Sequence, residues 1–185
     1  MLVSSLGSKN LSRNPDIFSE LISHLRTYAV RTDGPFTLAS GAVSSWYLDG
    51  RQTTFDGEGA RRVSAAVLEV LEETVSAVGG MTMGADPIAV ATAVCADRPL
   101  TAFSIRKAAK DHGTGGRLVG PITSEDRVCV VEDTMTTGSS TVAAIEVLRD
   151  ADIEVVQVIT VVDRSRGAAR AAMAALGLEL TTLVT

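Results

Sequence analysis

The sequence predicts an α/β fold: a central parallel sheet flanked by helices. A small N-terminal unit of short strands, which we call the hood, precedes it within about residues 1–50. Two observations lead to this prediction. From about residue 77, apolar strand-like runs alternate with helical patterns, which is typical of a parallel sheet with right-handed crossovers. The run Val128–Val131 is continuously apolar and β-prone, as in a strand covered on both faces. The 185 residues fit one domain, residues 1–185, because no linker, repeat or low-complexity segment divides them.

The N-terminal part predicts a helix followed by short strands. Asn14 is a candidate N-cap and Pro15 suits the first helical position, before apolar residues at helical spacing. We expect His24 on this helix to be exposed. After a break at Asp33-Gly34-Pro35, residues 36–50 predict two short strands around a Ser40-Gly41 turn. Residues 1–50 therefore form the predicted helix and hood.

The predicted core, about residues 58–185, follows in order along the chain. Its first helix is expected over residues 58–76, because apolar residues recur there at helical spacing. A short strand should then end at Gly79-Gly80. The remaining predicted elements are a helix at 86–96, strands at 100–106 and 127–133, a helix at 139–150, a strand at 154–162, a helix at 167–176 and a strand at 178–184.

Composition excludes several classes of protein. The net charge of −5 argues against nonspecific binding to nucleic acid or to an anionic membrane. No apolar stretch reaches the length of a membrane span, and no signal peptide is readable. Cys95 and Cys129 lack metal or redox spacing and lie in apolar runs, so we expect two buried thiols. These features predict a soluble, cytoplasmic protein.

The most informative segment is residues 128–141, VCVVEDTMTTGSST. A buried strand ends in Glu132 and Asp133, and a loop of Thr, Gly and Ser leads into a helix. Open α/β folds bind ligands at this edge of the sheet, and a helix N-terminus with backbone N–H groups holds phosphate. A plain strand-to-helix turn is the alternative. The combination predicts a ligand with both phosphate and hydroxyl groups, such as a ribose phosphate.

Two cationic features accompany this segment. Residues 106–117 contain four cations against one carboxylate, a net charge of +3, which leaves −8 on the rest of a chain whose total is −5. This glycine-containing loop is expected to act as a lid over an anionic ligand, the alternative being a solvated surface loop. Arg164 follows the strand 154–162, where its guanidinium could hold a planar carboxylate or could simply pair with Asp163 or a helix end.

The run VVEDTMTTGSS resembles the phosphoribosyl pyrophosphate (PRPP) signature of the type I phosphoribosyltransferases. The loop RKAAKDHG resembles the catalytic loop of the orotate phosphoribosyltransferases within that family, and the resemblance extends over roughly residues 16–166. It includes TLASGAVSSWYLDG, GGMTMGADPIA and VVDRSRG in the family order. The resemblance implies the type I phosphoribosyltransferase fold and the magnesium-dependent transfer of a phosphoribosyl group from PRPP to orotate.

The resemblance also implies roles for particular residues. Glu132 and Asp133 would bind the ribose hydroxyls, and Thr136 and Arg164 would bind orotate. Mg²⁺ would arrive with PRPP, with no direct protein ligand. A homodimer is implied as well, in which loop 106–117 reaches the neighbouring site. The loop residues expected to cover the pyrophosphate are Arg106, Lys107, Lys110 and His112, of which the last three are the candidate catalytic residues; those expected to cradle the 5′-phosphate are Thr134, Met135, Thr136, Thr137, Gly138, Ser139 and Ser140.

Two positions depart from the family pattern. Many relatives carry lysine where this chain has Ala39, and another family lysine is matched by Met83. Two readings of function stay open beside transfer to orotate. One is transfer to a purine or to another pyrimidine, and the other is a PRPP-binding regulator without turnover. Trp46 and Tyr47 are expected either to line the base pocket or to pack in the core.

Overall fold

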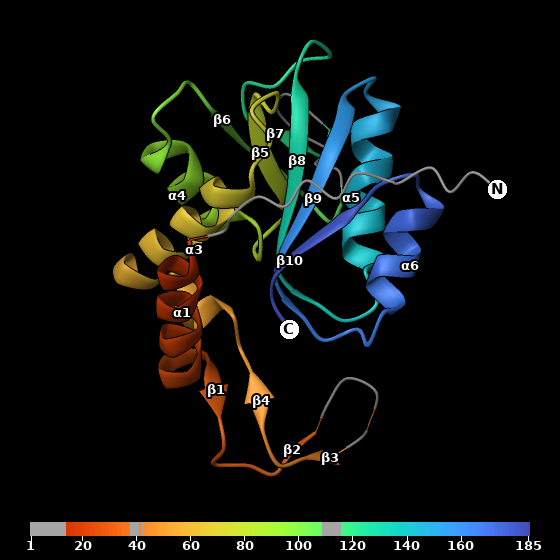
Figure 1. Ribbon diagram of the computed structural model, residues 1–185. Helices are drawn as coiled ribbons and strands as arrows, with labels where there is room; N and C mark the ends of the chain where they lie inside the picture. The colour runs from red at the N-terminus through yellow and green to blue at the C-terminus, as the bar shows by residue number, and fades with distance from the viewer. Residues whose placement is uncertain (1–13, 38–40, 42, 109–115) are drawn as a thin grey trace, which may run out of the picture.

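The structure is a computed structural model that describes residues 14–37, 41, 43–108 and 116–185. Its centre is a six-stranded sheet in the order β10-β9-β8-β5-β6-β7 (Figure 1). Every neighbouring pair is parallel except β6 and β7. The predicted parallel sheet is therefore confirmed. The strands are β5 (Ala77–Met81), β6 (Thr101–Ile105), β7 (Leu118–Val119), β8 (Arg127–Met135), β9 (Glu154–Asp163) and β10 (Leu180–Val184).

Helices cover both faces of this sheet. On one side lie α1 (Pro15–His24), α3 (Gly57–Val70) and α4 (Asp86–Cys95), and on the other lie α5 (Ser139–Asp150) and α6 (Ala168–Ala175) (Figure 1). Strand β8 shows why its sequence is uniformly apolar. Cys129 and Val131 point into the core between the sheet and helices α1, α3 and α4, whereas Val128 and Val130 point into the core between the sheet and helices α5 and α6. Successive side chains alternate between faces, so a strand with two covered faces has apolar residues throughout.

The hood lies next to the carboxyl edge of the sheet (Figure 1). A π-helical turn, η1 (Leu25–Ala29), continues α1 and leads into two small antiparallel sheets. A Cβ at Gly50 would lie 3.2 Å from Asp133 Oδ2, so the end of the hood meets the end of β8 at close range. The hood elements are β1 (Val30–Arg31) paired with β4 (Tyr47–Leu48), β2 (Phe36–Thr37) paired with β3 (Val43–Ser44), and α2 (Arg51–Thr54).

The predicted helix over residues 58–76 is too long at its C-terminal end. The helix ends at Val70, because Leu71 adopts an extended conformation with φ −70° and ψ 128°. Val75 is nevertheless buried in the core. The apolar pattern therefore predicted the burial of this residue correctly but its helical conformation wrongly. Strand β8 is two residues longer than predicted. The elements that we did not predict are short: η1, β1, β4, α2 and β7.

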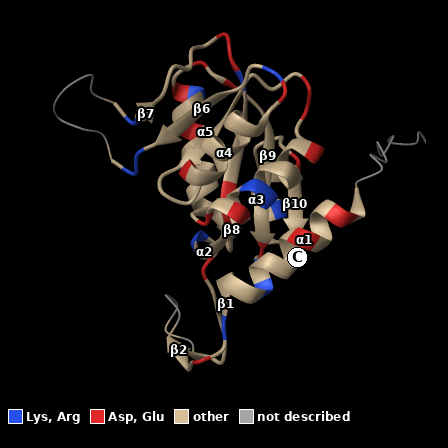
Figure 2. Cartoon of the chain, turned by 90° about the vertical axis from the view of Figure 1, so that its left-hand side faces the viewer, with Lys and Arg blue, Asp and Glu red and all other residues tan. Residues whose placement is uncertain are grey.

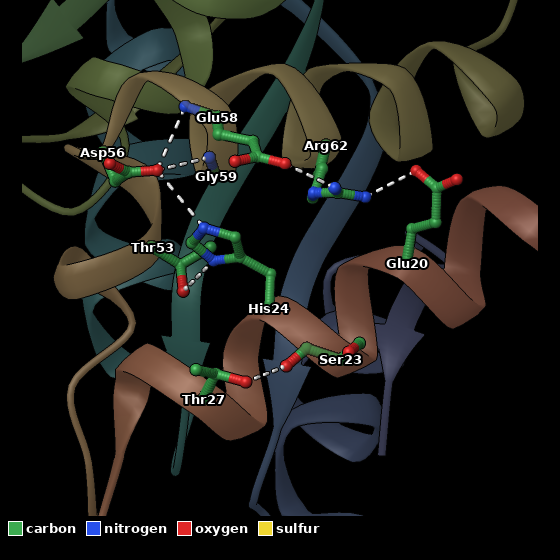
Figure 3. Close-up of polar contacts among 9 residues, drawn as sticks. All are labelled: Glu20, Ser23, His24, Thr27, Thr53, Asp56, Glu58, Gly59 and Arg62. Carbon is green, nitrogen blue, oxygen red and sulfur yellow. Dashed lines mark hydrogen bonds and ion pairs between the residues drawn. The ribbon is translucent and has the colours of Figure 1, made fainter.

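The expectation that His24 is exposed is wrong. Its side chain is 6% exposed and lies between α1 and the start of α3 (Figure 3). His24 Nδ1 lies 3.3 Å from Thr53 Oγ1, and Nε2 lies 3.2 Å from Asp56 Oδ2. Asp56 also accepts hydrogen bonds from the backbone N–H groups of Glu58 and Gly59, so it caps α3. This cluster therefore joins the first helix to the core.

The two cysteines differ in burial. Cys129 is buried in β8, as expected, whereas Cys95 at the end of α4 is exposed. Both are free thiols. The apolar run that contains Cys95 is helical, so one side of it faces away from the core; Val90 and Val94 of the same helix are exposed too.

Candidate active site

A cavity of about 1090 Å³ lies at the carboxyl edge of the sheet. The register of β8 and β9 pairs Met135 with Asp163, so the residues after both strands reach the cavity together. The hood supplies the opposite wall. The lining residues are Tyr47, Leu48, Asp49, Gly50, Arg51, Met81, Thr82, Met83, Gly84, Lys107, Glu132, Asp133, Thr134, Thr136, Thr137, Ser140, Arg164 and Arg166.

Glu132 and Asp133 form a carboxylate pair at the base of the cavity. Glu132 is 9% exposed, and burial, with the charge of Asp133, raises the pKa of Glu132 to about 8. Burial also raises the pKa of Asp133, although the backbone N–H of Thr134, 2.8 Å from Asp133 Oδ1, acts in the opposite direction. Two carboxylates so placed favour a ligand that brings hydrogen-bond donors or positive charge.

The loop after β8 forms a second, smaller cavity of about 90 Å³. Gly138 has φ +82°, a left-handed conformation that glycine adopts without strain, and it begins α5. The Thr137 hydroxyl accepts a hydrogen bond from the Ser139 N–H at 3.3 Å. The first amides of a helix lack intrahelical partners, so they are free to bind an anion. The cavity is lined by Glu132, Thr134, Met135, Thr136, Thr137, Gly138, Ser139, Ser140 and Thr141.

Four cations line the large cavity. Lys107 is exposed and lies two residues before the undescribed segment 109–115. Figure 2 shows Lys or Arg on the chain on both sides of that segment. Arg51 is held by Asp49, with Nε 2.8 Å from Oδ1, and this hydrogen bond lowers the pKa of Asp49. Arg164 and Arg166 follow β9. Cations on several sides of a carboxylate pair suit a ligand that carries phosphate and hydroxyl groups.

The guanidinium of Arg164 has an aromatic partner. Its Cζ lies 4.4 Å from the ring centroid of Trp46 in the hood. The backbone N–H of Arg164 donates to the Met135 carbonyl at 2.8 Å, while Asp163 Oδ1 accepts from Ser165 N–H at 2.7 Å. The alternative in which Arg164 pairs with Asp163 is therefore wrong.

Most of the predicted site residues are brought together. Glu132, Asp133, Thr134, Thr136, Thr137, Ser140, Lys107 and Arg164 line the large cavity, and Met135, Gly138 and Ser139 line the small one. Arg106 lines neither, because its backbone pairs with that of Arg117 across the hairpin of β6 and β7. Lys110, His112 and Ala39 lie outside the described residues. The roles of all these residues remain predictions.

Some cavity residues were missed by the sequence analysis as candidates. Asp49 and Arg51 follow the hood strands, and Arg166 lies two residues beyond Arg164. Both segments lie within the runs YLDG and VVDRSRG, or directly after them, so proximity to those runs was the available signal. Trp46 is 41% exposed, so the alternative in which it packs in the core is wrong, and Tyr47 lines the cavity.

The chemistry of the cavity is compatible with a magnesium ion that arrives with the phosphates of a ligand. No three His, Cys, Asp or Glu side chains gather as a metal site in residues 14–37, 41, 43–108 and 116–185. Carboxylate oxygens are the ligands that Mg²⁺ prefers, and it is usually bound through few carboxylates together with substrate phosphates. A Cβ at Gly84 would lie 2.7 Å from Glu132 Oε1, so glycine leaves these oxygens accessible.

The chain is similar to curated proteins over almost its whole length. It is 44% identical over 167 residues to the orotate phosphoribosyltransferase of Streptomyces avermitilis, covering 88% of this chain and 91% of that protein. It is 41% identical over 174 residues to the corresponding protein of Corynebacterium glutamicum, covering 94% of each chain. The chain belongs to the orotate phosphoribosyltransferases. It is therefore a pentosyltransferase of pyrimidine biosynthesis, and the expected family is confirmed.

Solved structures agree with this assignment. The orotate phosphoribosyltransferase of Mycobacterium tuberculosis in complex with PRPP is 35% identical, with a TM-score of 0.78 over 91% of this chain and 95% of that one. The adenine phosphoribosyltransferase of Rhodothermus marinus, 18% identical with a TM-score of 0.62, shows the shared type I fold alone. No protein-family model matches the chain. Among the described residues, none of the helices has the length and apolar character to cross a membrane.

Proposed function

We propose that this orotate phosphoribosyltransferase transfers the 5-phosphoribosyl group of PRPP to orotate with Mg²⁺, using the cavity between the sheet edge and the hood. The products are orotidine 5′-monophosphate and pyrophosphate. The observation that carries this proposal is the placement of three features at one edge of the sheet: a buried carboxylate pair, a phosphate-sized loop, and Arg164, whose side-chain N–H groups have no hydrogen-bond acceptor among the described residues.

Each feature suits one part of the reactants. The N–H groups at the start of α5 and the hydroxyls of the loop would hold the 5′-phosphate. The Glu132–Asp133 pair would accept hydrogen bonds from the ribose hydroxyls, which stabilises the charged carboxylates at neutral pH. Thr136 and Arg164 would orient orotate, because a planar guanidinium matches a carboxylate with two parallel hydrogen bonds.

The reaction breaks a bond at the anomeric carbon, so positive charge develops on the sugar. We expect negative charge on Glu132 and Asp133, which line the cavity, to stabilise that transition state. The leaving pyrophosphate would be neutralised by Lys107 together with the predicted residues Arg106, Lys110 and His112. A Mg²⁺ ion bound with PRPP would supply further positive charge to the pyrophosphate oxygens.

The lid proposal is tested by Lys110→Ala. Loss of one charged donor at a transition state lowers turnover by about 10²–10³-fold, so kcat should fall strongly while the melting temperature is unchanged. Steady-state assays with thermal unfolding measure both quantities. Wild-type turnover in this variant would remove loop 106–117 from the mechanism.

We further propose a homodimer in which this loop acts in the neighbouring site. Two variants with strongly reduced activity, Lys110→Ala and Asp133→Asn, test it when they are mixed and allowed to exchange subunits. A mixed dimer would have one site with both wild-type residues, so about a quarter of wild-type activity should return with statistical exchange. No recovery despite proven subunit exchange would show that each loop serves its own subunit.

The reaction itself is tested by mixing the protein with PRPP, Mg²⁺ and one base at a time. Loss of orotate absorbance, and no consumption of uracil, adenine, hypoxanthine or xanthine, is the expected result. Consumption of another base would still support PRPP binding in the cavity, but it would contradict the proposed role of Arg164 in binding orotate. PRPP binding without any turnover would instead favour a regulator. The expected cytoplasmic location and lack of nucleic-acid binding belong to the same proposal, and the two free cysteines are consistent with a reducing compartment.

A further inference from the structure

We propose that Trp46 is a positioning residue for Arg164: the indole face fixes the guanidinium so that its edge is presented to the carboxylate of the base. This inference rests on the proposed role of Arg164 in binding orotate. Trp46 does not line the cavity, whereas Arg164 does. Trp46 would therefore influence the base through Arg164 and not by contact of its own.

The geometry of the pair supports a role for Trp46 in orienting Arg164. Arg164 Cζ lies 4.4 Å from the ring centroid of Trp46, well within the range of a cation–π contact. Stacking occupies the face of a guanidinium and leaves the N–H groups in its plane available. Among the described residues, the Arg164 side chain makes no hydrogen bond and no ion pair, so nothing there competes for those donors.

The backbones of both partners are held. Arg164 N–H donates to the Met135 carbonyl at the end of β8. Ser44 Oγ donates to the Trp46 carbonyl at 2.7 Å and accepts from the Trp46 N–H at 3.3 Å, which fixes the turn that carries the indole. The flexible part of the pair is thus the arginine side chain, and the stack restricts it. A pre-oriented arginine loses less entropy when a ligand binds.

The stack is also the bridge between the hood and the core at this point of the cavity. Trp46 belongs to the segment between β3 and β4, and Arg164 follows β9. With 41% of its surface exposed, Trp46 does little for the core, so packing alone does not account for a large aromatic residue at this position. Holding Arg164 does account for it.

A set of matched variants tests the inference by kinetics. Trp46→Leu keeps an apolar side chain but removes the π face, whereas Trp46→Phe keeps a ring. We expect Trp46→Leu to raise the KM for orotate about two- to fivefold, the fold-change that corresponds to the ~0.5–1 kcal/mol of a partly exposed cation–π contact. The KM for PRPP, kcat and the melting temperature should be unchanged, and Trp46→Phe should restore most of the loss.

Val43→Ala is the control for the hood. Val43 is an exposed residue of β3, outside the cavity, so its truncation should leave every kinetic constant at the wild-type value. A Trp46→Leu enzyme with an unchanged KM for orotate would overturn the inference. Equal losses for both substrates together with a lower melting temperature would also overturn it, because they indicate a structural role.

Fluorescence tests the stack without turnover. Trp46 is the single tryptophan of the chain, so all tryptophan emission comes from it. Arg164→Ala should change the intensity or emission maximum of the ligand-free protein, whereas Arg166→Ala, which removes a cation two residues away, should not. Identical spectra for wild type and Arg164→Ala would overturn the inference. A wild-type protein that consumes no base would refute the proposed function, and the spectra would still decide whether the stack exists.

Discussion

One part of the core side of the cavity, residues 132–140, is a continuous segment of strand end, turn and helix start, whereas the hood run of residues 47–51 reaches the cavity only because the hood packs against the core. Residues 132–140 run from the end of β8 into the start of α5, so their backbone arrangement is largely local. In the hood, Trp46 meets Arg164 from a position more than a hundred residues away in the sequence. Arg51 and Asp133, which are also far apart in the sequence, line the same cavity.

This difference has consequences for what each side does. The core side contains Glu132 and Asp133, two buried carboxyl groups whose pKa values are raised. Burial makes their charged forms unfavourable unless a ligand supplies hydrogen bonds or positive charge. The hood side offers exposed or half-buried groups, Arg51, Tyr47 and Trp46, which adjust the site. Changes in the core side should therefore alter activity strongly, and changes in the hood should alter it weakly.

Among the residues that line the cavity, the largest expected effect is that of Asp133→Asn. Loss of a charged acceptor for the ribose lowers kcat/KM for PRPP by about 10–100-fold, the equivalent of the ~1.5–3 kcal/mol of a hydrogen bond to a charged group. The ligand-free variant should melt no lower than wild type, because a neutral amide replaces a carboxylate whose burial disfavours its charged form. Steady-state kinetics and calorimetry measure the two quantities. A parallel loss of stability and activity would instead indicate a structural role for Asp133.

The second effect concerns pH. The pKa of Glu132 is about 8 in the folded protein and near 4.5 in the unfolded chain. A raised pKa means that the contribution of this group to stability is complete below about pH 4.5 and is lost as the pH rises through about 8. Relative to Glu132→Gln, the ligand-free wild-type protein should thus lose melting temperature between pH 5 and pH 9, by roughly 2–4 °C for each kcal/mol. Parallel pH profiles of the two proteins would contradict this.

At the base of the hood, His24→Ala should reduce stability more than activity. It leaves the buried Thr53 hydroxyl without its partner, which costs about 1–3 kcal/mol in the free energy of unfolding. The kinetic constants should stay near wild type, because His24 lies outside the cavity. Urea unfolding measures the loss, and His24→Gln, which keeps a hydrogen-bonding side chain, is the control. A large fall in kcat with normal stability would place His24 in the catalytic machinery.

The smallest effect is expected for Arg51→Gln. Its guanidinium is exposed and already paired with Asp49, so its removal should raise the KM for PRPP only about two- to fivefold. Because an exposed charge is screened by salt, the difference from wild type should shrink as ionic strength rises. Kinetics at low and high salt check this. An effect as large as that of Asp133→Asn would erase the contrast between the two sides of the cavity.

The sequence predicts locally determined segments more accurately than contacts between distant parts of the chain. The helix 139–150 was predicted to the residue, and the parallel strands of the sheet to within about two residues, because periodicity and turn residues act over short range. The short antiparallel strand β7 was not predicted. The segment after Val70 was predicted wrongly, since Val75 is buried without being helical. His24 was expected to be exposed because an isolated polar residue on a helix gives no sign of partners elsewhere in the chain.

The sequence by itself determined the parallel sheet, the carboxylate-and-glycine loop at its edge and the family. These properties are encoded in contiguous segments, where strand, turn and helix signals act within a few residues of one another. Only the tertiary structure decided that Trp46 stacks on Arg164, that Arg51 and Asp133 line one cavity and that His24 is buried against Thr53. Such contacts join residues that are far apart in the chain, and their burial and geometry arise only when the hood and the core pack together.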